Sequence, residues 1–123
     1  MSTDSSVMIV DDDEDIREIE TIVLESHGYK VTAAKDGVDA LQILKRKHVE
    51  LILLDLMMPR MDGEQFLKAL RASENADIPV VLMSGHSEAS EIARKLSANG
   101  ILRKPVDVDV LLKTVRRWAR SRE

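Results

Sequence analysis

A chain of 123 residues is long enough for one domain with a buried core, and a content of 44% hydrophobic and 33% charged residues is typical of globular proteins. The formal net charge of −4 argues against a nucleic-acid-binding domain, because contacts to phosphates need a basic surface. The sequence has no cysteine, no apolar stretch long enough to span a membrane, and no signal-peptide pattern at its start. We therefore expect a cytoplasmic protein that does not insert into membranes and has no thiol chemistry.

Short apolar runs recur along the chain and predict five strands. The predicted strands are Val7–Val10, Val31–Ala34, Leu51–Leu54, Val80–Met83 and Ile101–Leu102. Three of these runs are continuously apolar, which is typical of strands that are covered on both faces of a sheet.

The segments between the runs carry apolar residues at helical spacing. The first stripe consists of Ile16, Ile19, Ile22 and Val23, and Gly28 suits the end of that helix. The later stripes are Ala40, Leu41 and Leu44; Phe66, Leu67 and Leu70; Ile92 and Leu96; and Val108, Leu111, Leu112, Val115 and Ala119. Five strand–helix units predict a parallel sheet with helices on both faces. We expect residues 1–123 to form a single domain, with residues 1–6 and the last few frayed.

Charged side chains follow several of the predicted strands. Asp55 comes directly after Leu51–Leu54, Asp11 and Asp12 follow the first run in the same way, and Lys104 follows the last. In open α/β sheets, ligands bind at the carboxyl ends of the parallel strands. Three acids and one base therefore meet at one edge if these strands are neighbours.

Each of these residues taken singly has an ordinary explanation. The acids from Asp11 to Asp15 suit a solvated loop before a helix, Asp55 suits a turn, and Lys104 suits the surface. Together they are harder to explain, because carboxylates at one edge repel each other unless a cation joins them. Mg²⁺ takes oxygen ligands and often uses one or two carboxylates, and a nearby lysine could hold a phosphoryl oxygen.

The chain resembles a known family, the receiver domains of response regulators. These domains are the phosphoacceptor modules of two-component signalling. The matching stretches are Val10-Asp11-Asp12, residues 35–41, residues 55–63, Ser84 after the fourth strand, and Gly100 through Lys104-Pro105. They occur in order and cover almost the whole chain. The resemblance implies a flavodoxin-like, doubly wound, five-stranded parallel sheet in the order 2-1-3-4-5 with five helices.

The resemblance also implies roles for individual residues. Asp55 is similar to the aspartate that takes the phosphoryl group. Asp11, Asp12, Asp55 and the backbone carbonyl of Met57 are similar to the ligands of Mg²⁺, which Mn²⁺ can replace. Phosphoryl transfer depends mainly on positioning and charge neutralisation, which suits this set of residues.

Two further residues are similar to those that respond to the phosphoryl group. Ser84 is similar to the hydroxyl residue and Lys104 to the lysine that bind it, and the bond from Lys104 to Pro105 is expected to be cis. The implied donor is a phosphohistidine of a sensor histidine kinase or a histidine phosphotransfer protein. The implied output is a conformational switch read by a downstream protein partner or a phosphorelay. Such a domain promotes only its own phosphorylation and dephosphorylation and is not an enzyme.

The chain departs from the family pattern at one switch position. Ile101 stands where many members have an aromatic side chain, so we expect the signal to use Ser84 and the fourth helix instead. Met57 and His86 occupy the two positions that tune the loss of phosphate. The apolar Met57 predicts a slow loss, while His86 could guide water or simply lie in a solvated loop.

Two other classes of protein were weighed against this interpretation. A phosphatase of the haloacid dehalogenase type needs a second acid two residues after the nucleophile, where this chain has Met57, so that class is rejected. A pseudo-receiver that only binds partners remains an alternative, although all five site positions are present. The same residues fit a stand-alone regulator and a receiver within a longer protein.

Overall fold

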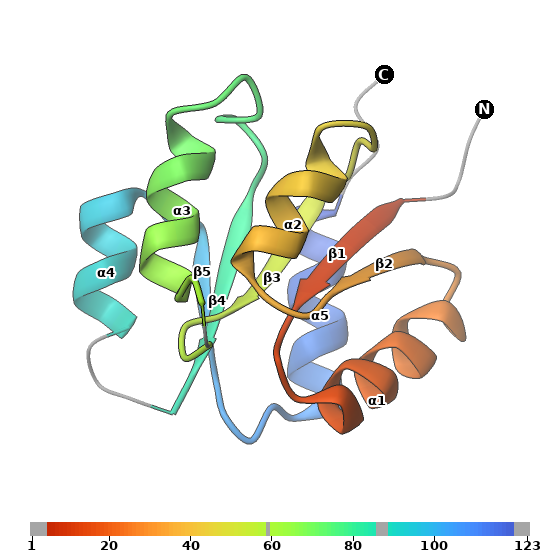
Figure 1. The fold of residues 1–123 in the computed structure, drawn as a ribbon. Helices are drawn as coiled ribbons and strands as arrows, with labels where there is room; N and C mark the ends of the chain where they lie inside the picture. Colours follow the sequence, from red (N-terminus) through yellow and green to blue (C-terminus); the bar gives the residue numbers. More distant parts are fainter. Residues whose placement is uncertain (1–4, 59, 86–88, 120–123) are drawn as a thin grey trace.

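A computed structural model describes residues 5–58, 60–85 and 89–119 of the chain. Its elements in chain order are β1 (Ser6–Val10), α1 (Glu14–Glu25), β2 (Lys30–Ala34), α2 (Gly37–Leu44), β3 (Leu51–Asp55), α3 (Gly63–Arg71), β4 (Val80–Ser84), α4 (Ala89–Leu96), β5 (Gly100–Arg103) and α5 (Val108–Trp118). The strands pair in parallel in the order β2-β1-β3-β4-β5 (Figure 1). The predicted fold class is confirmed, and each strand is slightly longer than the apolar run that predicted it.

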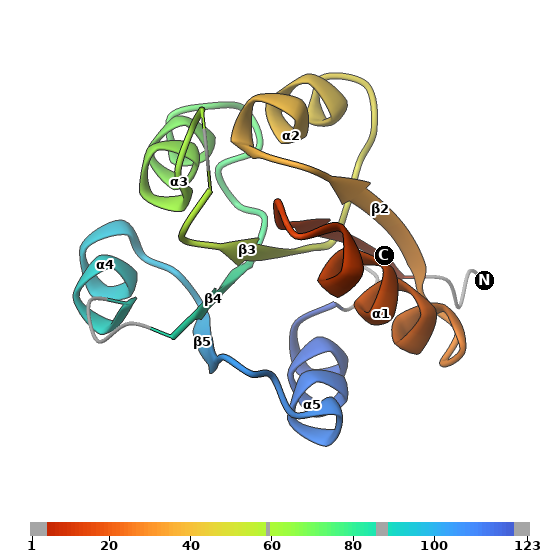
Figure 2. The ribbon, with the colours of Figure 1, turned by 60° about the horizontal axis from the view of Figure 1, so that its bottom comes forward.

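The helices cover both faces of this sheet. Helices α2, α3 and α4 lie on one face, and α1 and α5 lie together on the other (Figure 2). Strand β3 is covered on both faces, which explains its apolar sequence. Ile52 and Leu54 pack on the side of α2, α3 and α4, and Leu51 and Leu53 pack on the side of α1 and α5. No helix within the described residues is long and apolar enough to cross a membrane.

Helix α1 is rotated from the orientation that its apolar stripe predicted. Ile19 and Ile22 are each 59% exposed, whereas Glu20 and Leu24 are buried. The prediction was therefore wrong at these positions, because the side of a helix that meets the sheet is set by how it crosses the strands. Gly28 lies just beyond the helix with a φ of 92°, a left-handed conformation that favours glycine, as expected after a helix end.

The expected fraying is wrong at the end of the first segment. Ser6 begins β1 and pairs in register with Lys30, and Ser5 is buried. The backbone carbonyl of Ser5 also accepts a hydrogen bond of 2.9 Å from the backbone N–H of Lys30. The backbone hydrogen bonds between β1 and β2 therefore order Ser5 and Ser6, which are polar and could not be predicted as part of a strand from an apolar pattern.

Arg71 at the end of α3 ties several backbone segments together. Its guanidinium donates hydrogen bonds of 2.8 Å to the carbonyls of both Ala76 and Ile78, in the connection to β4. It also donates to the carbonyls of Leu96 at 3.4 Å and Ser97 at 3.0 Å, at the end of α4. One side chain thus joins the carboxyl-terminal ends of α3 and α4.

The start of α3 lies directly against the end of β3. Asp62 and Gln65 form a capping box, in which each side chain accepts a hydrogen bond from the backbone N–H of the other. Gly63 is the first residue of the helix after Asp62, and a Cβ added to it would lie 2.7 Å from Cα of Leu56 and 2.8 Å from the carbonyl oxygen of Asp55. Glycine therefore permits the close approach that positions the loop after Asp55.

We predict that Gly63→Ala destabilises the protein by about 1–3 kcal/mol, because the added methyl group meets backbone atoms that cannot rotate away. Denaturant unfolding measures this change. Gly85→Ala is the matched control, since no atom of the described residues lies within 4 Å of a Cβ at that position. Equal stabilities of the Gly63→Ala variant and the wild type would contradict the steric argument.

Candidate functional site

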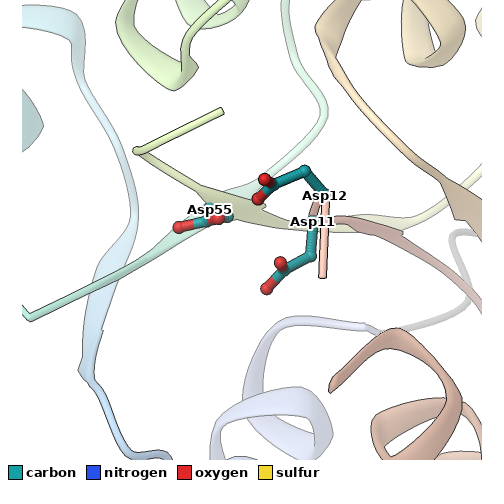
Figure 3. A group of neighbouring side chains, drawn as sticks. All are labelled: Asp11, Asp12 and Asp55. Atoms are coloured by element: carbon teal, nitrogen blue, oxygen red, sulfur yellow. The ribbon is translucent and has the colours of Figure 1, made fainter. Parts of the chain in front are cut away.

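Three carboxylates gather at the carboxyl edge of the sheet. Asp55 is the last residue of β3, and Asp11 and Asp12 follow β1, its neighbour in the sheet. Each offers an oxygen atom, and these atoms lie within 4.8 Å of one another (Figure 3). Asp11 is fully buried and Asp55 is 3% exposed, whereas Asp12 faces solvent. The convergence predicted from the sequence is therefore present.

A backbone N–H donates a hydrogen bond to each of the two buried carboxylates. Oδ1 of Asp11 accepts a hydrogen bond of 2.9 Å from the N–H of Asp13, and the carbonyl of Asp11 accepts one of 2.7 Å from Arg17. Oδ1 of Asp55 accepts a longer bond of 3.3 Å from the N–H of Met57. The turn after each strand therefore helps to fix the carboxylate at its end.

Lys104 supplies the nearby positive charge. Its Nζ lies 3.0 Å from Oδ1 of Asp55 and 3.4 Å from Oδ2 of Asp11. Its backbone N–H donates to the carbonyl of Ser84 at 3.2 Å, and its peptide bond to Pro105 is cis, as the resemblance predicted. One ammonium thus bridges two carboxylates that would otherwise repel each other.

The pKa values of Asp55 and Lys104 indicate that the site is short of positive charge. Burial and then the charge of Asp11 raise the pKa of Asp55 to about 6, although contacts with Lys104 and the N–H of Met57 oppose this rise. Burial alone would lower the pKa of Lys104, but Asp55 and Asp11 outweigh it and raise that pKa. Asp55 is therefore harder to ionise than an ordinary aspartate even beside a lysine, so a further cation would stabilise its charged form.

The donor set fits a hard divalent cation. Carboxylate oxygens are the ligands that Mg²⁺ prefers, and a cluster with one exposed member leaves room for the water molecules that this ion retains. The residues at this edge therefore suit Mg²⁺ by their chemistry.

The remaining predicted site residues are distributed around this cluster. Ser84 ends β4 and is 3% exposed, one residue beyond the partner of Asp55 in the sheet register. The side chain of Met57 is largely exposed (62%), and Ile101 in β5 is partly exposed. His86 lies outside the described residues.

Two buried acids outside the cluster, Asp36 and Glu20, were not predicted as such from the sequence. Asp36 caps α2 and binds Arg60, with 2.7 Å between Nε and Oδ2. Glu20 is buried in α1, four residues after Ile16 and three before Val23, which is helical spacing on one face. That spacing was the signal that could have revealed Glu20.

The strand order and the edge site together define a flavodoxin-like α/β domain in which acids and a lysine are arranged for a cation and an anionic group. A sequence model described as the response regulator receiver domain matches residues 7–116. The chain belongs to this family, whose members act as phosphoacceptors in two-component systems. The pocket of Asp11, Asp12 and Asp55 fits that role.

Individual relatives agree with this assignment. The chain is 33% identical to the CAI-1 autoinducer sensor kinase/phosphatase CqsS of Vibrio cholerae over 116 residues, which is 91% of this chain and 17% of CqsS. The chemotaxis protein CheY4 of Vibrio cholerae superposes with a TM-score of 0.87 and 32% identity, covering 93% of this chain and 98% of that one.

The receiver domain of sensor histidine kinase PA1611 from Pseudomonas aeruginosa also gives a TM-score of 0.87, at 26% identity, covering 97% of this chain and all of that one. That structure has a magnesium ion coordinated in its active-site cleft. The chain spans less than half the length of CqsS and of other curated relatives that it matches, such as the response regulator MprA.

We predict that Asp55→Asn stabilises the metal-free protein at pH 7.5 by about 1–2 kcal/mol. The pKa of Asp55 is raised in the folded state from 3.8 to about 6, so its charge costs stability as pH rises through this window. The gain should therefore shrink as pH falls towards 4. Denaturant unfolding at several pH values measures it.

Asp36→Asn is the matched control, because Asp36 is as buried as Asp55 but has the opposite shift. Burial would raise its pKa, yet the N–H of Asp39 and the charge of Arg60 outweigh burial and lower it. This variant should be less stable than the wild type at pH 7.5, with a loss that shrinks on acidification. A loss of stability in Asp55→Asn would contradict the charge argument.

Proposed function

We propose that this protein accepts a phosphoryl group on Asp55 from a phosphohistidine of a sensor histidine kinase or a histidine phosphotransfer protein. The observation that carries the proposal is the Asp55 carboxylate at the end of β3, 3.0 Å from Lys104 and grouped with Asp11 and Asp12. A downstream protein partner or a phosphorelay would then receive the signal, in the cytoplasm. We infer that the domain promotes only its own phosphorylation and dephosphorylation.

The acidic cluster is proposed to hold Mg²⁺, which Mn²⁺ can replace. The ligands would be the carboxylates of Asp11, Asp12 and Asp55 and the backbone carbonyl of Met57. When bound, the ion supplies positive charge beside the oxygens of the phosphoryl group.

The protein's own groups supply positioning and charge. With a pKa of about 6, Asp55 is mostly ionised at neutral pH, and a carboxylate oxygen can attack the phosphorus in line with the donor. The bond from phosphorus to the imidazole nitrogen breaks as the bond to the Asp55 oxygen forms, leaving an acyl phosphate and a neutral histidine once that nitrogen is protonated. Lys104 already contacts Asp55, so its ammonium can pair with the new phosphoryl oxygens.

Other residues would respond to the acyl phosphate. The Ser84 hydroxyl, at the same edge, is proposed to donate a hydrogen bond to a phosphoryl oxygen and so carry the change towards α4. Ile101 lacks the aromatic ring that many receivers use in this response. Met57, next to Asp55 and largely exposed, is proposed to shield the acyl phosphate from water, with His86 as the second tuning residue.

We predict that incubation with acetyl phosphate and Mg²⁺ adds one phosphoryl group to the wild type and none to Asp55→Asn, because only the carboxylate can attack. Intact-protein mass spectrometry detects the adduct. Asp36→Asn, which removes an equally buried carboxylate, should keep the full adduct. An undiminished adduct in Asp55→Asn would refute the assignment, and failure of both wild type and Asp36→Asn would favour a pseudo-receiver.

We predict that Mg²⁺ raises the melting temperature of the wild type by a few degrees, because an ion at about ten times its dissociation constant stabilises the native state by about 1.4 kcal/mol. Asp12→Ala should lose this rise, since it removes an exposed ligand without disturbing the core. Asp15→Ala, which removes another exposed acid from the same segment, should retain it. Equal rises in melting temperature in both variants would show that the ion binds elsewhere.

A further inference from the structure

Among the methionines of the described residues, one is far more open to solvent than the rest. Met57, in the loop after β3, is 62% exposed, whereas Met8 in β1 and Met83 in β4 are fully buried. Met58 and Met61, in the same loop as Met57, are partly buried and pack against the core on the side of α2, α3 and α4. A reagent that attacks thioethers from solution therefore meets Met57 first.

The neighbouring Met61 shows how packing protects a thioether in this loop. A Cβ added to Gly37 would lie 2.9 Å from both Cγ and Sδ of Met61, so this sulfur lies directly against the start of α2. Such close cover restricts the approach of a second molecule to the sulfur. The two methionines thus form a matched pair, one covered and one exposed, within a single loop.

Met57 also lies beside the carboxylate that accepts the phosphoryl group in the proposed function. It comes two residues after Asp55, and its backbone N–H donates a hydrogen bond of 3.3 Å to Oδ1 of Asp55. A thioether suits the shielding role proposed for Met57, because its sulfur is only a weak hydrogen-bond acceptor. One oxygen atom added to this sulfur would convert the apolar side chain into a polar one.

We propose that Met57 is a site of reversible oxidation, at which hydrogen peroxide converts the thioether to a sulfoxide and so shortens the lifetime of the acyl phosphate on Asp55. The sulfur lone pair attacks one peroxide oxygen as the O–O bond breaks. The sulfur is oxidised by two electrons, and the other peroxide oxygen leaves as water after taking the proton of the first. The oxidation itself rests on exposure, whereas its effect on lifetime rests on the proposed function.

The new S–O group changes how Met57 interacts with water. Its oxygen accepts hydrogen bonds from water, which the thioether sulfur does only weakly. A water molecule held beside the acyl phosphate can attack the phosphorus as the bond to the Asp55 oxygen breaks. The products are inorganic phosphate, which retains the proton of the water, and a free carboxylate. Oxidation therefore ends the phosphorylated state sooner.

Oxygen uptake tests the selectivity of the reaction. The full chain is incubated with hydrogen peroxide in saturating Mg²⁺, and peptide mapping by mass spectrometry locates each added oxygen. Met57 should react before the other described methionines. Met8 and Met83 should react at least about a hundredfold more slowly, because a core strand must open before its side chains meet solvent. Faster uptake by any other described methionine would overturn the proposal.

The lifetime of the phosphorylated protein tests the consequence. Peroxide-treated and untreated proteins are phosphorylated with acetyl phosphate and Mg²⁺, and the adduct is followed by intact-protein mass spectrometry after the donor is removed. Oxidation should shorten the half-life by about two- to tenfold, the range that one added hydrogen bond contributes. Treatment with a methionine sulfoxide reductase should restore the original half-life, which irreversible damage would not allow.

Substitutions separate the sulfur of Met57 from the rest of the loop. Peroxide should leave the half-life of Met57→Leu unchanged, whereas Met61→Leu should respond as the wild type does. Met57→Gln, which carries a polar acceptor, should lose phosphate faster than Met57→Leu without peroxide. A peroxide effect that persists in Met57→Leu, or equal half-lives of treated and untreated wild type, would overturn the proposal. Absence of any adduct on the untreated wild type would instead refute the proposed function, and with it the effect on lifetime.

Discussion

The contact of one ammonium with two buried carboxylates is the constraint on which the functional edge depends. Lys104 follows β5, whereas Asp55 ends β3 and Asp11 follows β1, so three strands must end at the same level for these groups to meet. In the sheet order, β4 separates β3 from β5, and the lysine therefore reaches across an intervening strand. Without this charge, two carboxylates would be buried beside each other with only backbone donors to stabilise them.

The same constraint leaves the edge of the sheet short of positive charge. Burial and then the charge of Asp11 keep the pKa of Asp55 above its ordinary value despite Lys104, so an added cation would stabilise the site. Burial and then the charge of Asp11 also raise the pKa of Glu20 in α1, with Lys104 opposing and Asp55 adding to the rise. Strands β1 and β3, buried except for Ser6, hold the three aspartates close together, since the apolar cores on both faces leave little freedom for the strands to separate.

The strands and the site edge could be predicted because each depends on a short, strong pattern. Leu51–Leu54 is apolar on both faces, and an acid directly after such a run lies at the carboxyl end of a strand. The rotation of α1 could not be predicted from the sequence, because the exposed Ile19 and Ile22 are as apolar as the residues that are buried in the core. Glu20 was missed because only apolar residues were assigned to the buried stripe of the helix, although its spacing from Ile16 and Val23 fits the same face. The 3.0 Å contact of Lys104 depends on strand order, which came from the family resemblance rather than from periodicity.

The hydrogen bonds of Arg71 fix the carboxyl-terminal end of α4 against α3. Its guanidinium anchors the carbonyls of Leu96 and Ser97 to α3, so a reorientation of α4 that preserves these bonds must pivot about that end. The opposite end, at Ala89, follows the segment that leaves Ser84. An eight-residue helix is about 12 Å long, so a tilt of about 10° moves its free end by about 2 Å. The free end of α4 therefore lies on the side of the aspartate cluster, where a small displacement would tilt the whole outer surface of α4.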